Sequence, residues 1–382
     1  MTLSRRRTLA LLGGGIVLAA AAGTGATRYA ARSPGEALAP WAAAGGYDDI
    51  RLRALSWALL APNPHNRQPW VAELTGADTV RIWRDPALNL PVTDPFDRQL
   101  TIGMGCFLEL MVLAAAEEGV GVTLTLFPEG EDPNLPIAEA VFDGAAEPDP
   151  LFAEAPRRRS TKEPFDMDRP VAPETLAGLI ANGQVRRGAT ADPTEVAALR
   201  TLAHDAWQVE MRTPSALAES INLMRIGASQ INANPDGIDL NAALPVALNR
   251  IGLMPRESLK DPESTGFKQT EAMYAAIFEA TPAFVWLATS GNTRRDQIAA
   301  GRAWLRLNLE TTAEGLALHP VSQALQEYPE MAALYADAHT RLAGPGETVQ
   351  MLGRLGYGPT VPETPRWPLA AKLRESADRQ PA

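Results

Sequence analysis

Apolar residues recur along the chain with two spacings, one typical of helices and the other of strands. Spacings of three and four residues predict helices over residues 47–60, 105–118, 173–180, 193–211 and 296–313. Alternating or β-branched apolar runs predict strands over residues 71–74, 80–83, 120–127 and 283–288. The pattern therefore predicts a chain that mixes helices with strands.

Two stretches interrupt this pattern. Residues 128–150 are rich in Pro, Glu, Asp and Gly, which is typical of a linker, and they separate a first half (47–150) from a second half (151–382). Residues 213–264 are rich in Asn, Pro, Asp and Gly. A long irregular stretch is usually a functional lid or a disordered segment, so we expect a lid-like insertion there.

The two halves share one detail of spacing. Gly105 is predicted to begin an apolar helix that ends near Gly119, and Gly301 one that ends near Gly315, so the spacing is 14 residues in both. A strand-like apolar run follows each helix. Two ordinary helix-to-strand units with a glycine cap would give the same spacing, so the spacing alone leaves an internal repeat open.

The N-terminus has the features of an export signal. Three arginines follow Ser4, and an uncharged stretch rich in Ala, Gly and Leu extends to Arg28. The paired arginines resemble a twin-arginine (Tat) signal over residues 1–33, which implies contact with the Tat translocase and a periplasmic or cell-envelope location. An uncleaved membrane anchor is the alternative. The Tat route carries folded cargo, which favours a cofactor that is loaded before export.

Composition excludes some classes of function. The chain has 35 Lys and Arg against 45 Asp and Glu, a formal net charge of −10, which argues against nucleic acid as the main partner. Cys106 is the single cysteine, so no intrachain disulfide forms, and we expect it in the core. No zinc-type ligand spacing occurs, and we expect no structural metal.

Four segments carry candidate chemistry. The loop 61–70 offers Asn63, His65 and Asn66, and amide side chains can both donate to and accept from the edge of a flavin ring. A proline-fixed turn with Trp70 in the core is the alternative. Residues 157–165 combine cations with hydroxyls, which suits a phosphate group, although a solvated basic run is possible. The candidate ligands there are Arg158, Arg159, Ser160 and Lys162.

The remaining two segments lie nearer the C-terminus. A strand is expected to end in a turn at Pro320, leaving free backbone N–H groups that would stabilise negative charge on a reduced cofactor. The residues of this turn are Pro320, Val321, Ser322 and Gln323. Arg366 follows Arg354-Leu-Gly-Tyr-Gly-Pro and is a candidate second phosphate ligand. The alternatives are a plain turn and a surface arginine.

Taken in order, the four segments resemble motifs of the nitroreductase family of FMN proteins. The quoted runs are APNPHNRQPW, RRSTKEPFD, AEGLALHPVSQ and RLGYGPTVPETPRWPL. The loop precedes the phosphate motif here, whereas the family has the reverse order within one short subunit. A fused, single-chain form of this kind is similar to the Acg-like, Tat-exported branch of the family. The resemblance implies an α+β, nitroreductase-like fold whose two fused halves form a pseudo-dimer with a lid-like insertion.

The same resemblance implies a function. A fused, diverged pair would keep one composite FMN site in a monomer, with the phosphate at Arg158, Ser160, Lys162 and Arg366 and the loop reaching in from the first half. The expected activity is reduction of small-molecule acceptors such as nitroaromatics, quinones or flavins. A non-catalytic protein that stores or sequesters FMN is the alternative. A cofactor-free module that binds peptidoglycan or a protein partner is a third class.

Overall fold

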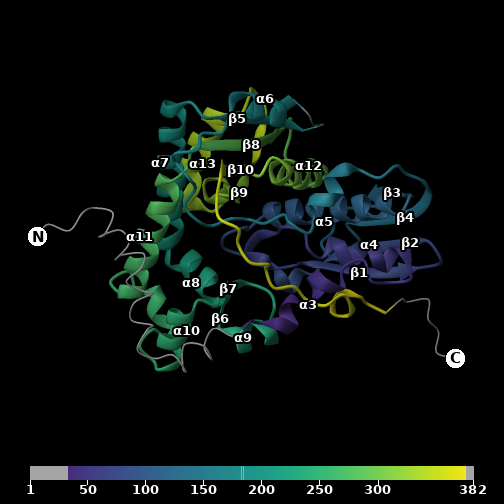
Figure 1. The fold of residues 1–382 in the computed structure, drawn as a ribbon, viewed down its shortest axis with the longest axis horizontal. Coiled ribbons are helices and arrows are strands. Elements are labelled where there is room, and N and C mark those ends of the chain that lie inside the picture. The colour runs from purple at the N-terminus through teal and green to yellow at the C-terminus, as the bar shows by residue number, and fades with distance from the viewer. Residues whose placement is uncertain (1–32, 182, 184, 376–382) are drawn as a thin grey trace, which may run out of the picture.

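The computed structural model describes residues 33–181, 183 and 185–375, and the predicted signal segment lies almost wholly outside them. Two four-stranded antiparallel sheets, with helices packed around them, confirm the predicted α+β fold. The four strands of one sheet lie before residue 150, and those of the other lie after it. Figure 1 shows the arrangement.

The first sheet contains the three strands predicted in this half and one more. Its strands are β1 (Trp70–Thr75), β2 (Thr79–Arg84), β3 (Val120–Leu126) and β4 (Ala138–Ala145), in the order β1-β2-β4-β3. The linker prediction for 128–150 was therefore wrong. In β4, buried Ala138, Ala140 and Phe142 alternate with more exposed neighbours, and the polar residues Glu139 and Asp143 among those neighbours made the stretch resemble a linker.

The second sheet has the same order of strands. It contains β5 (Arg186–Thr190), β8 (Ala283–Thr289), β9 (Ala317–Pro320) and β10 (Thr348–Gly356), in the order β5-β8-β10-β9. If the four strands of each sheet are numbered in chain order, their spatial order in both sheets is first, second, fourth, third. A 20-residue helix follows the second strand of each sheet, α5 (Arg98–Glu117) after β2 and α12 (Arg294–Ala313) after β8.

Helices α5 and α12 cross at the two glycines that the sequence pairs. Each glycine is seven residues after its helix begins, at Arg98 and Arg294, so the prediction that the glycines themselves begin the two helices was wrong. A Cβ on Gly105 would lie 2.9 Å from the Cα of Gly301, and one on Gly301 would lie 2.8 Å from the Cα of Gly105. The backbones therefore touch, which only glycine allows.

One apolar core extends through both halves. It includes Ile82 of the first sheet, Leu287 of the second, and much of α5 and α12. Cys106 is buried in this core, as predicted, and its Sγ donates to the carbonyl of Gly301. Helix α5 is also long and apolar enough to cross a membrane, but 89% of its apolar window is buried inside the protein, which is typical of a core helix.

Further helices cover the sheets and the core pair. Three of them match predicted helices: α4 (Ile50–Ala58), α6 (Pro173–Ala181) and α7 (Pro193–Arg212). The sequence pattern did not indicate α3 (Gly35–Ala43), α11 (Thr265–Glu279) or α13 (Ala332–Leu342).

The insertion 213–264 is built from short elements and is not irregular. They are α8 (Pro214–Asn222), β6 (Met224–Ile226), α9 (Ala228–Ala233), β7 (Ile238–Leu240) and α10 (Ala243–Arg250), followed by a short 3-10 helix, Arg256–Lys260. Each element is nine residues or shorter, so no window of the sequence is long enough to display its period. The insertion packs against α3, where Asn232 accepts the backbone N–H of Ala37.

Candidate functional site

The loop between α4 and β1 holds three non-glycine residues in the left-handed region of backbone conformation. The φ angles are 48° at His65, 51° at Asn66 and 49° at Gln68. Such a conformation costs on the order of 1 kcal/mol for each residue, and it persists only where surrounding contacts impose it. The loop is therefore a strained segment that its neighbours hold in place.

Contacts from two distant segments hold this loop. The Gln68 side chain donates from Nε2 to the carbonyl of Pro235 in the insertion (2.7 Å) and accepts the N–H of Trp367 in the C-terminal segment (2.9 Å). Arg67 forms a buried ion pair with Asp236 of the insertion. Asn63 accepts the backbone N–H of Gln68 at 2.7 Å, which closes the loop on itself.

Asn66 uses its amide group within the protein. Its Nδ2 donates to the carbonyl of Pro365 at 3.0 Å, and its Oδ1 accepts from Nη1 of Arg366 at 2.5 Å. The structure thus brings two predicted site residues, Asn66 and Arg366, into direct contact although they are 300 positions apart in the chain. In this arrangement Asn66 orients Arg366.

Three arginines from two segments converge beside this loop. Arg158 donates to the carbonyl of Leu60 at 2.9 Å and to Oδ1 of Asn308 on α12 at 3.0 Å. Arg366 donates to the same Leu60 carbonyl at 3.2 Å. Arg159 lies over the ring of Trp41 on α3, 4.4 Å from its centroid. We call Arg158, Arg159 and Arg366 the arginine cluster.

The arginine cluster has a surplus of positive charge. Among the described residues, neither Arg158 nor Arg366 forms an ion pair with a carboxylate, and Arg159 has Glu363 at 3.4 Å. Burial and then the Arg159 charge lower the pKa of Arg158 to about 10. Burial and then the Arg158 charge lower the pKa of Arg366 to about 9, although the Asp239 carboxylate acts in the opposite direction. The Nε atoms of Arg159 and Arg366 are buried, with no hydrogen-bond partner in the described part of the chain. An anion would relieve each of these costs.

Lys162 carries a charge that acts on two histidines, His65 and His319. It is exposed, whereas Ser160 is half-buried. Burial, followed by the charges of Lys162 and Arg67, lowers the pKa of His65 to about 4. Burial, with Arg354 and Lys162 after it, lowers the pKa of His319 on β9 well below its ordinary value. Both imidazoles are therefore neutral at pH 7, and the predicted cations form two groups.

The turn after β9 differs from the prediction in one donor. The N–H of Val321 donates to the carbonyl of Leu352 at 2.9 Å, so this donor is not free. The next residues form the 3-10 helix Ser322–Leu325, which begins without a side-chain cap. The first N–H groups of such a helix have no partner within it, so those of Ser322 and Gln323 remain the candidate donors.

Comparison with known proteins supports the resemblance that the four motifs indicate. No family model matches the chain. The chain is 26% identical over 326 residues to the putative NAD(P)H nitroreductase Rv3131 of Mycobacterium tuberculosis (strain ATCC 25618 / H37Rv), covering 82% of this chain and 87% of that protein. It is 25% identical over 356 residues to the putative NAD(P)H nitroreductase acg of the same strain, covering 84% of this chain and 94% of that one.

The chain is thus similar in sequence to Acg along most of its length. Among solved structures, the FMN-dependent nitroreductase NfnB from Mycobacterium smegmatis, in complex with NADPH, matches 57% of this chain and 94% of its own, with 18% identity and a TM-score of 0.36.

Two residues of the site went unnoticed in the sequence. Gln68 is fully buried and joins the loop to both the insertion and the C-terminal segment. Arg354, also fully buried, has its Nη1 2.8 Å from Nδ1 of His319 and thereby orients that ring. Both lie within the motifs that resemble the family, Gln68 in the loop 61–70 and Arg354 before Gly356. A polar residue next to apolar residues of a motif was the available signal that these side chains are buried and hydrogen-bonded.

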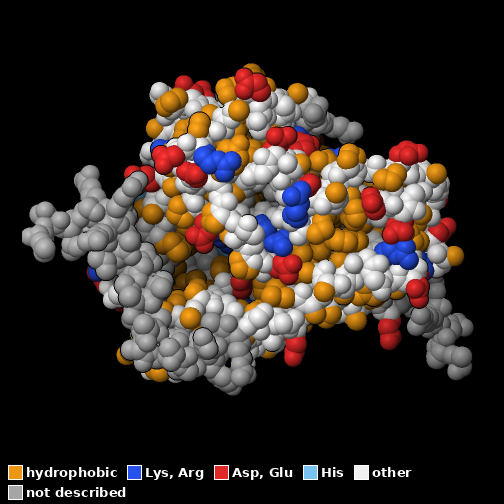
Figure 2. All heavy atoms as spheres, in the orientation of Figure 1, with side chains coloured by type: hydrophobic (Ala, Val, Ile, Leu, Met, Phe, Trp, Pro, Cys, Tyr) orange, Lys and Arg blue, Asp and Glu red, His pale blue; other side chains and the backbone are white. Residues whose placement is uncertain are grey.

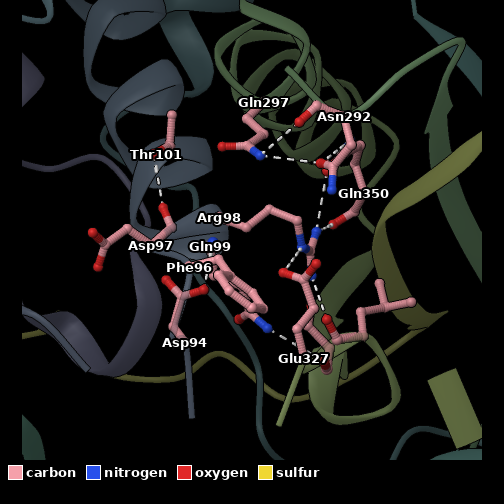
Figure 3. Close-up of polar contacts among 12 residues, drawn as sticks. Asp94, Phe96, Asp97, Arg98, Gln99, Thr101, Asn292, Gln297, Glu327 and Gln350 are labelled. Carbon is pink, nitrogen blue, oxygen red and sulfur yellow. Dashed lines mark hydrogen bonds and ion pairs between the residues drawn. The ribbon is translucent and has the colours of Figure 1, made fainter. Parts of the chain in front are cut away.

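A buried arginine fixes the start of α5 beside the turn that follows β9. Arg98 donates to Glu327 at 3.1 Å and to the carbonyl of Gln350 at 2.9 Å, and Figure 3 shows it reaching from α5 toward both. Asp94 accepts the first free N–H groups of the helix, those of Gln99 and Leu100. These contacts give the turn a rigid neighbour.

The C-terminal segment connects the halves at the site. It runs from the second sheet to α3 in Figure 1, and the N–H of Arg366 donates to the carbonyl of Ala37 at 2.8 Å. Figure 2 shows Lys and Arg side chains at the centre of the face where this segment crosses. Positive charge therefore gathers where the two halves and the insertion meet.

Proposed function

We propose that this chain is an FMN-dependent oxidoreductase that reduces nitroaromatic, quinone or flavin substrates. The observation that carries the proposal is the arginine cluster, in which three guanidinium groups converge and two of them are buried. The carboxylates that act on it are Glu363, 3.4 Å from Arg159, and Asp239, whose charge acts on Arg366, so positive charge remains in surplus. A buried surplus of positive charge favours an anionic ligand. The relatives named as nitroreductases agree in class.

The residues of the cluster fit a flavin phosphate. Guanidinium groups bind phosphate oxygens through two parallel N–H donors, and unpartnered Nε atoms on Arg159 and Arg366 supply donors that the protein does not use. Ser160, half-buried beside Arg159, adds a hydroxyl. We therefore assign phosphate binding to Arg158, Arg159, Ser160 and Arg366.

The second group of residues suits the ring system. Bound FMN would supply the hydride and electron transfer, and the protein would supply position and electrostatics. Lys162 brings a positive charge next to His65 and His319, both neutral, and this charge would stabilise an electron-rich ring. The N–H groups of Ser322 and Gln323 would donate from the opposite half, and Asn63 would line the loop side.

We further propose that the two halves are a fused pair with one composite site. The shared strand order and the Gly105–Gly301 crossing support the fusion. The cluster combines the loop carbonyl of Leu60 with Arg158 and Arg366 from beyond residue 150. Such a chain needs no second subunit, so we expect a monomer that the Tat translocase exports to the periplasm or cell envelope.

Storage of flavin is the second candidate function. The insertion and the C-terminal segment both brace the loop through Gln68, and a braced site would release its ligand slowly. Turnover of a nitroaromatic substrate with NAD(P)H would exclude pure storage. Slow flavin release combined with no reduction by either nicotinamide would favour it.

A comparison of two ligands tests the FMN assignment. Riboflavin lacks the phosphate, so we expect the wild-type protein to bind FMN at least about 100-fold more tightly, as judged by quenching of flavin fluorescence. Arg366→Gln should remove most of this preference. Arg374→Gln is the matched control, because Arg374 pairs with Glu73 away from the cluster. Equal affinity of the wild-type protein for the two flavins would refute the phosphate site.

A further inference from the structure

A group of buried polar side chains lies directly behind the turn that follows β9. At its centre is Glu210 on α7, which is 3% exposed. Its Oε1 accepts from the hydroxyl of Ser220 on α8 at 3.1 Å, and its Oε2 accepts from Nε2 of Gln326 at 3.3 Å. The phosphate and ring groups assigned above do not include this carboxyl group.

Three polar atoms around Glu210 are short of hydrogen-bond donors or acceptors. The Oε1 atoms of Gln323 and Gln326 and the hydroxyl of Tyr328 are buried without a partner among the described residues. Buried polar groups are almost always paired, so three unpaired ones in one group call for an explanation. A proton on Glu210 would add one O–H donor to the group.

The charges around Glu210 favour that proton. Burial raises the pKa of Glu210 to about 6; hydrogen bonds from Ser220, Gln326 and Gln323 lower it, and the Glu219 carboxylate on α8 raises it again. From the other side, burial and then the Glu210 charge raise the pKa of Tyr328.

Two further carboxylates lie near Tyr328, and each acts on another residue of the described chain. Glu327 pairs with Arg98 at 3.1 Å, and Glu330 acts on Tyr328. Among the described residues, Glu219 is the charged group that acts most on the pKa of Glu210, and it is acidic.

We propose that Glu210 is a positioning residue that takes up one proton from solvent and thereby fixes the segment Ser322–Tyr328 behind the flavin ring. The effect on the flavin rests on the proposed function, whereas proton uptake does not. The protonated acid donates its O–H to an unpaired oxygen of this segment. Loss of the proton places a negative charge behind the turn whose N–H groups face the ring, which weakens their pull on an electron-rich ligand.

The first test uses the protein without flavin. Glu210→Gln mimics the protonated acid, and Glu195→Gln on the same helix is the control because Glu195 is exposed. Infrared difference spectra of the wild type between pH 5 and pH 8 should contain the carbonyl band of a buried carboxylic acid. The component of this band that titrates near pH 6 should persist in E195Q and be lost in E210Q, whereas Asp94, another buried acid whose pKa is raised, contributes equally in all three proteins. Retention of the component near pH 6 in E210Q would overturn the assignment.

Urea unfolding gives the sign of the effect. The folded-state pKa of Glu210 is raised, so its contribution to stability is complete below its ordinary value of 4.5 and is lost as the pH rises through about 6. Between pH 4 and pH 8 the folding equilibrium constant of the wild type should fall about 30-fold relative to that of E210Q. Parallel pH profiles of the two proteins would overturn proton uptake.

A second variant keeps the proposal testable if E210Q folds poorly. Ser220→Ala removes a hydrogen bond that favours the ionised carboxyl, so the midpoint of the infrared titration should move to higher pH. An unchanged midpoint, or one at lower pH, would contradict the assignment.

The flavin arm tests positioning. The midpoint potential of bound FMN should follow the Glu210 titration between pH 5 and pH 8 in the wild type and in E195Q, beyond the dependence that remains in E210Q. Identical profiles in all three proteins would overturn the positioning role. A wild-type protein that binds no FMN would overturn the proposed function, while the infrared and unfolding profiles would still decide on proton uptake.

Discussion

The two halves have the same order of strands but differ in their connections, and one of these connections bears on the site. In the first half, eleven residues separate α4, which ends at Ala58, from β1, which begins at Trp70. In the second half, four residues separate α6, which ends at Ala181, from β5, which begins at Arg186. The long connection is the strained loop beside the arginine cluster. The framework is therefore shared, and the difference in function is concentrated in what is attached to it.

Two sets of contacts between the halves constrain the chain in different ways. The crossing of α5 and α12 constrains both halves equally, because each glycine meets the backbone of the other helix. The loop and the cluster constrain each other across the halves, because Arg158 and Arg366 share the Leu60 carbonyl. A second site of the same design would need another long connection, and the equivalent connection in the second half has four residues.

The largest expected effect comes from breaking the shared framework. Gly301→Val would place a branched side chain against the backbone of α5, where even a Cβ lies 2.8 Å from the Cα of Gly105. Because backbone cannot move aside cheaply, we expect a loss of about 4 kcal/mol or more in the free energy of unfolding, measured by urea denaturation.

Gly178→Ala on α6 is the matched control for that substitution. A Cβ at Gly178 meets nothing within 4 Å, so alanine should stabilise the protein by about 1 kcal/mol through helix propensity. Equal effects of the two substitutions would show that the crossing is not tightly packed.

A smaller loss in the free energy of unfolding is expected where Asp236 of the insertion pairs with Arg67 of the loop. Asp236 pairs with Arg67 and, at 2.8 Å, with Arg225, and its side chain is 7% exposed. Asp236→Asn leaves two cations without their counter-charge, so we expect a loss of about 3 kcal/mol and faster hydrogen exchange in residues 61–69.

The exposed pair Arg341–Asp337 provides the comparison for this prediction. Asp337→Asn should change the stability by less than about 1 kcal/mol, because solvent screens a surface ion pair. If Asp236→Asn had no larger effect than this, the insertion would not be what holds the loop.

The sequence predicted the parts of this molecule that depend on long periodic segments. Helices α7 and α12 and strands β1, β2, β3 and β8 were found, with boundaries mostly within two residues, because apolar spacing is regular over each. The pattern missed β4 and the elements of the insertion, because short elements flanked by Pro, Gly or acidic residues display too few periods.

The site was predictable in its residue types more than in its geometry. The sequence named Arg158, Arg159 and Arg366, but it placed Lys162 with them, whereas its charge acts on His65 and His319. It also counted Val321 as a free donor, although that N–H serves the sheet. Tertiary contacts between residues hundreds of positions apart decide these points, and spacing along one chain does not encode them.

The smallest expected effect on stability separates strain from function within the loop. His65→Gly removes the steric cost of a φ of 48°, which offsets the backbone entropy that glycine loses, so the free energy of unfolding should change by less than about 1 kcal/mol. The affinity for FMN should nevertheless fall several-fold, because the imidazole beside Lys162 is lost.

Asn66→Gly, at a φ of 51°, should instead destabilise the fold by about 1–3 kcal/mol, because Asn66 holds the buried Arg366. If the two glycine variants behave alike, the loop is held by backbone conformation alone, and the difference between the two halves is one of length and not of chemistry.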